Sequence, residues 1–431
     1  MKKVSTLIIA IICLIAAIAA GFGAYKYYNV KEPSPGSGNQ TEKPNTPPKE
    51  YNDTDYNVRL IKTVNSTQSD NYLISPYSIE IALNMLKAGA KEDTYKQIED
   101  VVGTRDIPVF NVKDRISVTN GAFIKDIYKD SVKKEFYDKL ASFDAELIFD
   151  KFTTPVKINN WVKEHTYEMI PEILKEISPD FVMGLANAVA IDVLWDHDFE
   201  CINTNDQEFT KSDGKKMKVE MMHNRYDDGD TKYFETDEAK GIILPYRAYD
   251  KNGNDEYHSD ETEFTQLEFV GILPNEDVDK YIEGLTSEKL TKFDEKVTTT
   301  KDAIISVSLP RFSYSFDLES FMDVLKAMGI KDAFDSEKAD FSGIMDMPLY
   351  VSTAIHKTYI DLNEKGTKAA AVTYFGMDKA SAADREKDKK QIVFNKPFIY
   401  MIRDSKTKEI LFFGVVEKPN EWKGSTCADE E

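Results

Sequence analysis

The chain has 431 residues, of which 41% are hydrophobic and 30% are charged, and its formal net charge is −20 at pH 7. A protein that binds nucleic acid needs clustered Lys and Arg to neutralise phosphates, so the acidic balance argues against that class. The hydrophobic content is enough for a large core, and a high net charge of one sign favours solubility.

The first residues predict a segment directed to a membrane. Lys2 and Lys3 precede an uncharged run, residues 4–24, whose length as a helix is close to the ~30 Å hydrocarbon core of a bilayer. Small residues near the end of the run are also compatible with signal cleavage. Residues 1–29 are therefore either a signal peptide or an N-terminal membrane anchor. Both alternatives place the rest of the chain outside the cytoplasm, secreted or tethered to the cell membrane.

Composition divides the rest of the chain into three parts. Residues 30–50 are rich in Pro, Gly, Ser, Asn and Lys and predict a disordered linker. One folded domain is expected over residues 51–420, followed by a polar acidic tail, residues 421–431. Cys13 lies in the leader and Cys427 in a polar tail, so one bridge is possible by count, but we expect no cysteine framework and interpret Cys201 as a small buried or half-buried residue.

Hydrophobic periodicity predicts both helices and strands along the domain. Helices are expected over residues 51–64, 79–88, 93–102, 131–140, 156–168 and 318–328. Strands are expected over residues 116–123, 185–194, 231–235, 241–246, 264–274 and 304–312, with a final hairpin of residues 392–403 and 409–416. The long apolar run 185–194 is interpreted as a fully buried strand. The fold class is therefore α+β, with mainly antiparallel sheets.

A run of small residues late in the chain has the pattern of a strand that is not yet part of a sheet. Gly366 supplies a flexible pivot, because a residue without a Cβ reaches backbone angles that others do not. The alternate positions Thr367, Ala369, Ala371 and Thr373 are small and uncharged. Since alternate residues of a strand share one face, this segment is able to bury one side by entering a sheet.

Several sequence blocks, in this order along the chain, resemble the serpin family of serine protease inhibitors. They are residues 71–79 (NYLISPYSI), 309–312 (LPRF), 339–344 (ADFSGI), 363–373 (NEKGTKAAAVT), 394–398 (FNKPF) and 412–416 (FFGVV). The resemblance implies the serpin fold, with a large central sheet A, smaller sheets, about eight or nine helices and an exposed reactive-centre loop over residues 364–393. It further implies a bacterial-type extracellular protein that is not an enzyme and uses no cofactor.

The resemblance also implies a mechanism. In an inhibitory serpin the protease cleaves the loop and forms a covalent acyl-enzyme, and the loop then inserts into the central sheet as a new strand. The residues implied for the hinge are Glu364, Gly366, Thr367, Ala369, Ala370, Ala371 and Thr373. Counting Glu364 as the first residue, the family's seventeenth position is Ala380, so the reactive bond is expected between Ala380 and Ser381, with Lys379 as the alternative.

The residue before the reactive bond indicates the partner. Ala380 suits an extracellular serine protease with a shallow pocket, elastase-like or subtilisin-like, whereas Lys379 suits a trypsin-like protease. A non-inhibitory serpin acting as a binding or carrier module is the second hypothesis, although such proteins tend to have bulky or charged hinge residues. The chain contains no G-x-S-x-G or H-E-x-x-H motif, which disfavours a hydrolase. Residues 384–390 are interpreted as a solvated linker beyond the bond.

Four polar residues match a buried cluster that the resemblance implies. Ser75, Ser78, Asn187 and His356 occupy the positions where serpins build the shutter, a group of hydrogen bonds under the main sheet. The alternative for His356 is an ordinary hydrogen-bonded core histidine.

Other features bound the possible ligands. Few residues separate the predicted elements 93–102 and 116–123, so a glycosaminoglycan-binding helix is not expected, and the acidic balance also argues against heparin. The acidic insertion 250–263 resembles a calcium loop in its oxygen spacing, but Asp255 stands where a glycine is needed. Neither this insertion nor residues 196–198 (DHD) is expected to bind a metal.

We expect a monomer that contacts membranes only through its N-terminal segment. Residues 165–170 lack the glycine usual in serpins.

Overall fold

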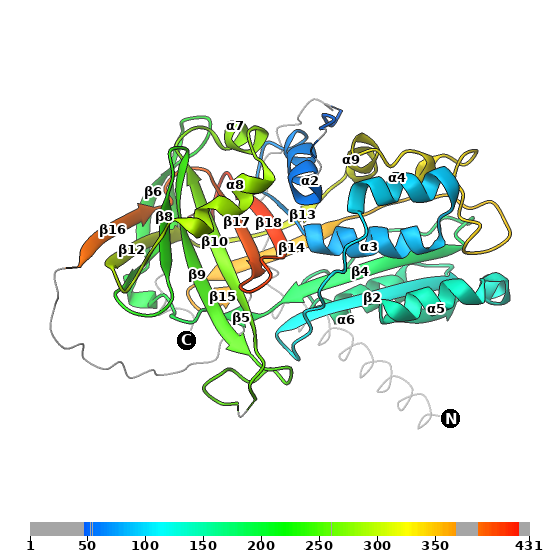
Figure 1. The fold of residues 1–431 in the computed structure, drawn as a ribbon, viewed down its shortest axis with the longest axis horizontal. Helices are drawn as coiled ribbons and strands as arrows, with labels where there is room; N and C mark the ends of the chain where they lie inside the picture. The colour runs from blue at the N-terminus through cyan, green and yellow to red at the C-terminus, as the bar shows by residue number, and fades with distance from the viewer. Residues whose placement is uncertain (1–46, 52, 54, 260, 368–386, 422–431) are drawn as a thin grey trace, which may run out of the picture. The chain divides into compact units, whose positions relative to one another are not determined.

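The computed structural model describes residues 47–51, 53, 55–259, 261–367 and 387–421. In these ranges eight α-helices and four short 3-10 helices accompany strands arranged in four hydrogen-bonded sheets (Figure 1). Neighbouring strands are antiparallel except for the pairs β12–β16 and β2–β3. The predicted α+β class with mainly antiparallel sheets is therefore confirmed.

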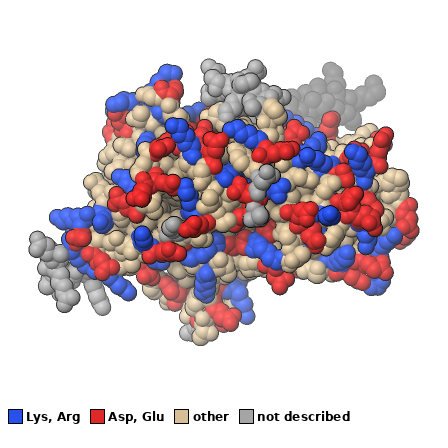
Figure 2. All heavy atoms as spheres, turned by 45° about the horizontal axis from the view of Figure 1, so that its top comes forward, with Lys and Arg blue, Asp and Glu red and all other residues tan. Residues whose placement is uncertain are grey.

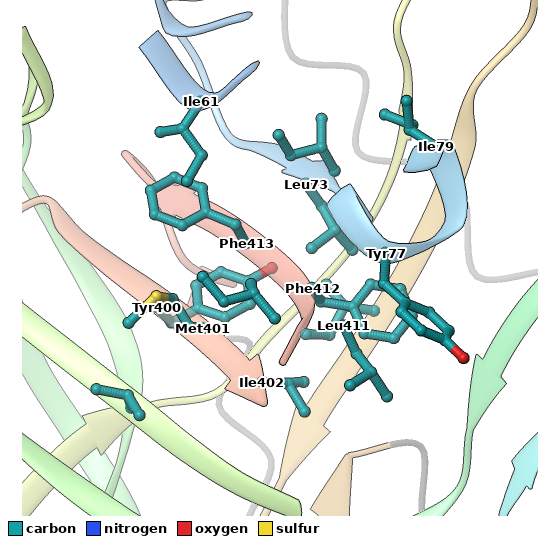
Figure 3. Close-up of a cluster of buried hydrophobic side chains, with 14 of the residues drawn as sticks. Ile61, Leu73, Tyr77, Ile79, Tyr400, Met401, Ile402, Leu411, Phe412 and Phe413 are labelled. Atoms are coloured by element: carbon teal, nitrogen blue, oxygen red, sulfur yellow. The ribbon is translucent and has the colours of Figure 1, made fainter. Parts of the chain in front are cut away.

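The largest sheet has seven strands in the order β1-β18-β17-β10-β9-β8-β11. Its strands are β1 (Tyr72–Ile74), β8 (Lys232–Glu235), β9 (Ala239–Tyr249), β10 (Thr265–Pro274), β11 (Val297–Thr299), β17 (Phe398–Asp404) and β18 (Ile410–Val416). Every residue of β17 and β18 is buried, as expected for central strands covered on both faces. Figure 3 shows side chains of these two strands meeting Leu73 of β1 and apolar residues of two helices, α2 and α3.

The helices begin where the local sequence caps them. They are α2 (Tyr56–Asn65), α3 (Pro76–Gly89), α4 (Glu92–Val102), α5 (Lys134–Ser142), α6 (Val156–His165), α7 (Val278–Glu283), α8 (Ser287–Thr291) and α9 (Phe321–Ala327). The 3-10 helices are η1 (Asp126–Ser131), η2 (Cys201–Asn203), η3 (Lys292–Glu295) and η4 (Asp332–Phe334). α3 starts earlier than predicted because Ser75 caps it, accepting a 3.1 Å hydrogen bond from the backbone of Ser78. α2 starts later because Asp55 caps it.

Two smaller sheets lie around the predicted hinge. One has the order β13-β14-β15-β5 and the other β3-β2-β4. Their strands are β2 (Ile116–Lys125), β3 (Ala145–Asp150), β4 (Met183–Ile191), β5 (Val193–Leu194), β13 (Phe312–Asp317), β14 (Lys357–Asn363) and β15 (Gly366–Thr367). The prediction of one fully buried strand over 185–194 is wrong. The backbone of Asp192 donates to the carbonyl of Arg115 at 2.7 Å and leaves the ladder there, and the first half of β4 is only partly buried.

The fourth sheet has the order β16-β12-β7-β6. Its strands are β6 (Asn205–Thr210), β7 (Lys216–Tyr226), β12 (Ala303–Pro310) and β16 (Asp388–Val393). The predicted strand 304–312 is two strands of different sheets, joined at Arg311. Residues 388–390, predicted as part of a solvated linker, are instead paired with β12, and residues 392–393 belong to this sheet rather than to the final hairpin.

The predicted terminal segments are not tested by this structure. No helix in the described part of the chain is long and apolar enough to cross a bilayer. Residues 1–46, which contain the predicted leader and most of the predicted linker, lie outside the described residues, as do residues 422–431. The alternatives of signal peptide and anchor therefore stay predictions.

Candidate functional site

The first two residues of the predicted hinge strand already belong to a sheet. Gly366 and Thr367 form β15, which pairs with Asn363 and Leu362 of β14 on one side and with β5 on the other. The expectation that the segment lies outside any sheet is wrong for these two residues. A Cβ added to Gly366 would lie 2.1 Å from the carbonyl oxygen of Val193, so only glycine allows β15 to approach β5 this closely.

Thr367 occupies a tight buried position. Its side chain is 2% exposed, and its hydroxyl lies 2.6 Å from the hydroxyl of Tyr246 in β9. The Tyr246 ring stacks on Trp195, with 4.5 Å between ring centres. Burial raises the pKa of Tyr246, so its phenol stays protonated and able to hydrogen bond. A small uncharged residue fits this position, whereas a long or charged side chain does not.

Glu364 anchors the turn that leads into β15. Its carboxylate is 3% exposed and accepts a 2.6 Å hydrogen bond from Arg311 and another from the hydroxyl of Thr204. Arg311 also lies 3.6 Å from Glu220 of β7. A buried carboxylate is stable only when it is paired in this way. The turn is therefore fixed to β7 and to the chain that precedes β6.

A slot continues from the end of β15. A cavity of about 20 Å³ adjoins Thr367 and lies between β4 and β14. Its lining includes Val189, Ala190 and Ile191 of β4, residues 358–361 of β14, and Leu73, Ile402 and Phe412 of the large sheet. In the described ranges no further strand pairs with β4 opposite β2, or with residues 357–361 of β14 opposite β13. These two strand edges can accept one more strand in line with β15.

The segment that follows α6 contributes the other side of the cavity. Thr166, Met169 and Ile170 line it, and the hydroxyl of Thr166 donates to the carbonyl of Val162 at 2.8 Å. Tyr167 and Glu168 have φ angles of 47° and 64°, which is the left-handed region that non-glycine residues disfavour. The strain falls in the stretch where the sequence lacks a glycine. A new strand in the slot would have to pass this segment.

Several predicted site residues lie outside the described part of the chain. They are the hinge residues Ala369, Ala370, Ala371 and Thr373 and the reactive-bond residues Lys379, Ala380 and Ser381. The predicted loop 364–393 is shorter at both ends, because β15 and β16 are strands.

Three of the four predicted shutter residues meet directly. The backbone of Ser75 donates to Nε2 of His356 at 3.1 Å, and the Ser75 hydroxyl donates to the carbonyl of Leu411 at 2.6 Å. The Ser75 hydroxyl also accepts the hydrogen bond from the Ser78 backbone. His356 is 7% exposed. The cluster therefore connects the start of α3 to β18 and to the residue just before β14.

Asn187 joins this cluster only through its backbone. The Ser78 hydroxyl lies 3.5 Å from the Asn187 carbonyl oxygen, which is at the limit of a hydrogen bond. The Asn187 amide instead donates to Asn120 at 2.8 Å, and Asn120 donates to the carbonyl of Phe143. Sequence reasoning missed Asn120, although a polar residue in the middle of the apolar strand 116–123 was a signal for it.

The buried histidine predicts an acid-sensitive fold. Burial lowers the pKa of His356 to about 4, whereas a histidine in an unfolded chain titrates near 6.5. The unfolded chain thus takes up a proton below pH ~6.5, whereas the native state does so only near pH 4. The free energy of unfolding therefore falls over this range by up to ~3 kcal/mol.

We expect the urea midpoint to drop between pH 7 and pH 5, and His356→Gln to remove much of that drop. His258→Gln, on an exposed loop, is the control; equal pH slopes in wild type and His356→Gln would contradict the prediction.

The single described cysteine departs from expectation. Cys201 is partly buried, in line with the prediction, but it is also disulfide-bonded, so the single bridge that the cysteine count allows is formed. Its possible partners in the sequence, Cys13 and Cys427, both lie outside the described residues. Cys201 lies in η2, on the connection from β5 to β6, three residues before Thr204.

Two sequence segments, residues 250–263 and 196–198, have a spacing that resembles a metal site. Their side chains make contacts within the protein. Asp250 accepts hydrogen bonds from the backbones of Asn252 and Asn254 and from the hydroxyl of Ser259, which lowers the pKa of Asp250 to about 2. His197 lies 3.1 Å from Asp196. In the described ranges no group of three or more His, Cys, Asp or Glu side chains is placed to hold a metal ion.

Comparison with known proteins agrees with this geometry. The family described as "Serpin (serine protease inhibitor)" matches residues 51–419. An uncharacterised serpin-like protein of Methanosarcina mazei is 29% identical over 83% of this chain and 83% of its own length. Human Serpin B13 is 27% identical over 84% of this chain and 96% of its own.

Among solved structures, the native state of the thermophilic serpin tengpin matches with a TM-score of 0.70 and 32% identity, covering 85% of this chain and 93% of tengpin's. The latent state of tengpin matches with a TM-score of 0.66. The chain belongs to the serpin family and has the serpin fold. Members of this family are serine protease inhibitors and not enzymes.

Proposed function

We propose that this protein is a bacterial-type extracellular serpin that traps an elastase-like or subtilisin-like serine protease. The observation that carries the proposal is the slot between β4 and β14. One end of this slot is already occupied by β15, which contains the hinge residues Gly366 and Thr367 and pairs with β14 and β5. A loop that is cut by a protease can extend into this slot from Gly366 and Thr367, which already pair with β14 and β5. The hinge residues are expected to be small and uncharged. Thr367 has such a side chain and is 2% exposed in the structure.

The trap works through the protease's own chemistry. The protease serine attacks the carbonyl carbon of Ala380, the bond to Ser381 breaks, the new amino group leaves with Ser381, and an ester joins Ala380 to the protease. Residues 368–380 are then free to extend β15 into the slot. Thirteen residues at ~3.3 Å each carry the attached protease about 43 Å before deacylation completes.

The surface indicates which partners to expect. Figure 2 shows Asp and Glu interspersed with Lys and Arg over one face, consistent with the net charge of −20. An acidic inhibitor attracts a protease with a basic surface and repels polyanions. We expect a monomer without cofactor or heparin activation, secreted or held at the membrane by residues 1–29.

The proposal predicts a covalent complex and a gain in heat resistance. Incubation with pancreatic elastase or subtilisin should give a complex that survives boiling in detergent, together with a released C-terminal fragment that mass spectrometry places at Ser381. A fragment that begins at Ala380 would instead assign the bond to Lys379 and a trypsin-like partner. Protein cut in the loop should unfold at a markedly higher temperature, because the new strand gains backbone hydrogen bonds on both sides. If loop cleavage leaves the unfolding temperature unchanged, a non-inhibitory carrier is the better hypothesis.

A further inference from the structure

One continuous segment, residues 195–204, receives the turn that precedes the hinge strand. The backbone of Trp195 donates to the carbonyl of Lys365 at 2.9 Å, and its indole donates to the carbonyl of Asn363 at 2.9 Å. The backbone of Phe199 donates to the carbonyl of Glu364 at 3.0 Å. The disulfide at Cys201 further constrains this segment. These contacts fix the backbone of the turn. The charged side chains of Glu364 and Lys365 are held by other contacts.

The two charged side chains of the turn have partners of opposite sign on different elements. The carboxylate of Glu364 is held by Arg311, as described above. Lys365 is held by Asp198, whose Oδ2 lies 3.2 Å from the Lys365 ammonium nitrogen. Asp198 belongs to the receiving segment, so this pair adds a side-chain contact directly between the receiving segment and the residue before Gly366.

The position of Asp198 is costly for a carboxylate. Its Oδ1 is buried without a hydrogen-bond partner in the described residues, and the guanidinium of Arg247 lies 4.0 Å from it. Burial raises the pKa of Asp198, opposed by the charges of Lys365, Arg247 and His197. The charged and titratable groups around it are Lys365 of the turn, Arg247 of β9, Asp255 of the β9–β10 connection, Tyr226 of β7, and Asp196 and His197 of its own segment. Asp198 therefore takes up a proton at a higher pH than an ordinary aspartate does.

We propose that Asp198 is a positioning residue for loop insertion, which holds Lys365 so that Gly366 starts the new strand in register. This inference rests on the trapping function proposed above. Register matters here because a slip by one residue exchanges the two faces of a strand. A slipped strand would turn Lys368 of the sequence toward the slot, where an unpaired charge is costly to bury.

The test measures how the protein partitions between trapped complex and cleaved inhibitor. Asp198→Asn keeps the shape and removes the charge, so it should raise the number of inhibitor molecules consumed per trapped protease roughly two- to fivefold, the effect of one partly exposed ion pair. Lys365→Met should do the same, and the double variant should be no worse than either single one. Asp198→Glu, which retains a carboxylate, should recover much of the wild-type partition.

A pH series separates positioning from a merely structural role. The wild-type partition should worsen as the pH is lowered and Asp198 is protonated, whereas that of Asp198→Asn should change less over the same pH series. The matched control is Asp206→Asn, which breaks the exposed Asp206–Lys218 pair between β6 and β7. Parallel pH profiles for wild type and Asp198→Asn, or additive effects of Asp198→Asn and Lys365→Met, would overturn the inference. If the wild type itself forms no complex, it is the trapping function that fails.

Discussion

Thr367→Arg is expected to convert the protein from an inhibitor into a substrate. The loop of the variant should still be cut, because the reactive bond is far from the hinge along the chain. Residue 367 is already buried in β15, so an arginine there should keep β15 from its site between β14 and β5, and the cut loop should then insert slowly or not at all, since the native side chain is 2% exposed. An unpaired buried charge costs several kcal/mol, so deacylation should win and little complex should form.

The surroundings of Thr367 explain why rearrangement would not rescue the variant. The only polar group within hydrogen-bond distance of its side chain in the described residues is the hydroxyl of Tyr246, which lies under the flat face of Trp195. The neighbouring Trp195 is 1% exposed, so the site is closed to water. In the described part of the chain the polar atoms of these two rings bond to a backbone carbonyl and to the Thr367 hydroxyl, neither of which is a counter-ion for arginine.

The measurement is a detergent-resistant complex assay with an elastase-like protease, alongside the rate of loop cleavage. Thr367→Ser, which keeps the hydroxyl and is smaller, is the control and should trap almost as well as the wild type. The unfolding temperature after cleavage should rise for Thr367→Ser but not for Thr367→Arg. A Thr367→Arg protein that still traps protease efficiently would show that residue 367 is not buried during trapping.

The parts of the fold that follow from local patterns could be predicted from the sequence, and those set by contacts between distant segments could not. The helix at 93–102 and the strand at 116–123 agree with α4 and β2 within a few residues, because their apolar spacing and end signals are local. β1 was missed since it is short and is stabilised by pairing with β18, far away in sequence. β6 was missed since most of its residues are polar and not buried, although it forms a hairpin with β7, the next strand. The break at Asp192 depends on a hydrogen bond to Arg115, which no local pattern reveals.

The same distinction applies to the candidate site. The family resemblance predicted a cluster that includes Ser75, Ser78 and His356, and Ser75 contacts the other two in the structure, but the partners Leu411 and Asn120 come from other strands. The start of insertion at β15 depends on the space beside Val193 and on the turn contacts of Trp195 and Phe199. The strained backbone of Tyr167 and Glu168 has no sequence signal except the missing glycine.

Arg311→Ala is expected to be the most destabilising single substitution at the turn. It would leave two nearby carboxylates, Glu364 and Glu220, at 3% and 8% exposure without their shared guanidinium. Removing one partner of a buried ion pair typically costs ~3–5 kcal/mol, because the remaining charge stays desolvated. The hydroxyl of Thr204 still donates to Glu364, but a neutral donor offsets only part of this cost.

The loss should appear both as a lower urea midpoint and as faster spontaneous loss of inhibitory activity at moderate temperature. A turn that is no longer anchored to Arg311 lets β14 and β5 separate more easily, which admits uncut loop into the slot. Adding Glu364→Ala to Arg311→Ala should recover part of the urea midpoint, because one of the two buried carboxylates that lost Arg311 is removed, but it should not restore trapping. Lys218→Ala, which breaks the exposed pair with Asp206 on the neighbouring strands β6 and β7, should change the midpoint by less than ~1 kcal/mol in equivalent free energy. If Arg311→Ala and Lys218→Ala behave alike, the buried ion pair does not hold the turn.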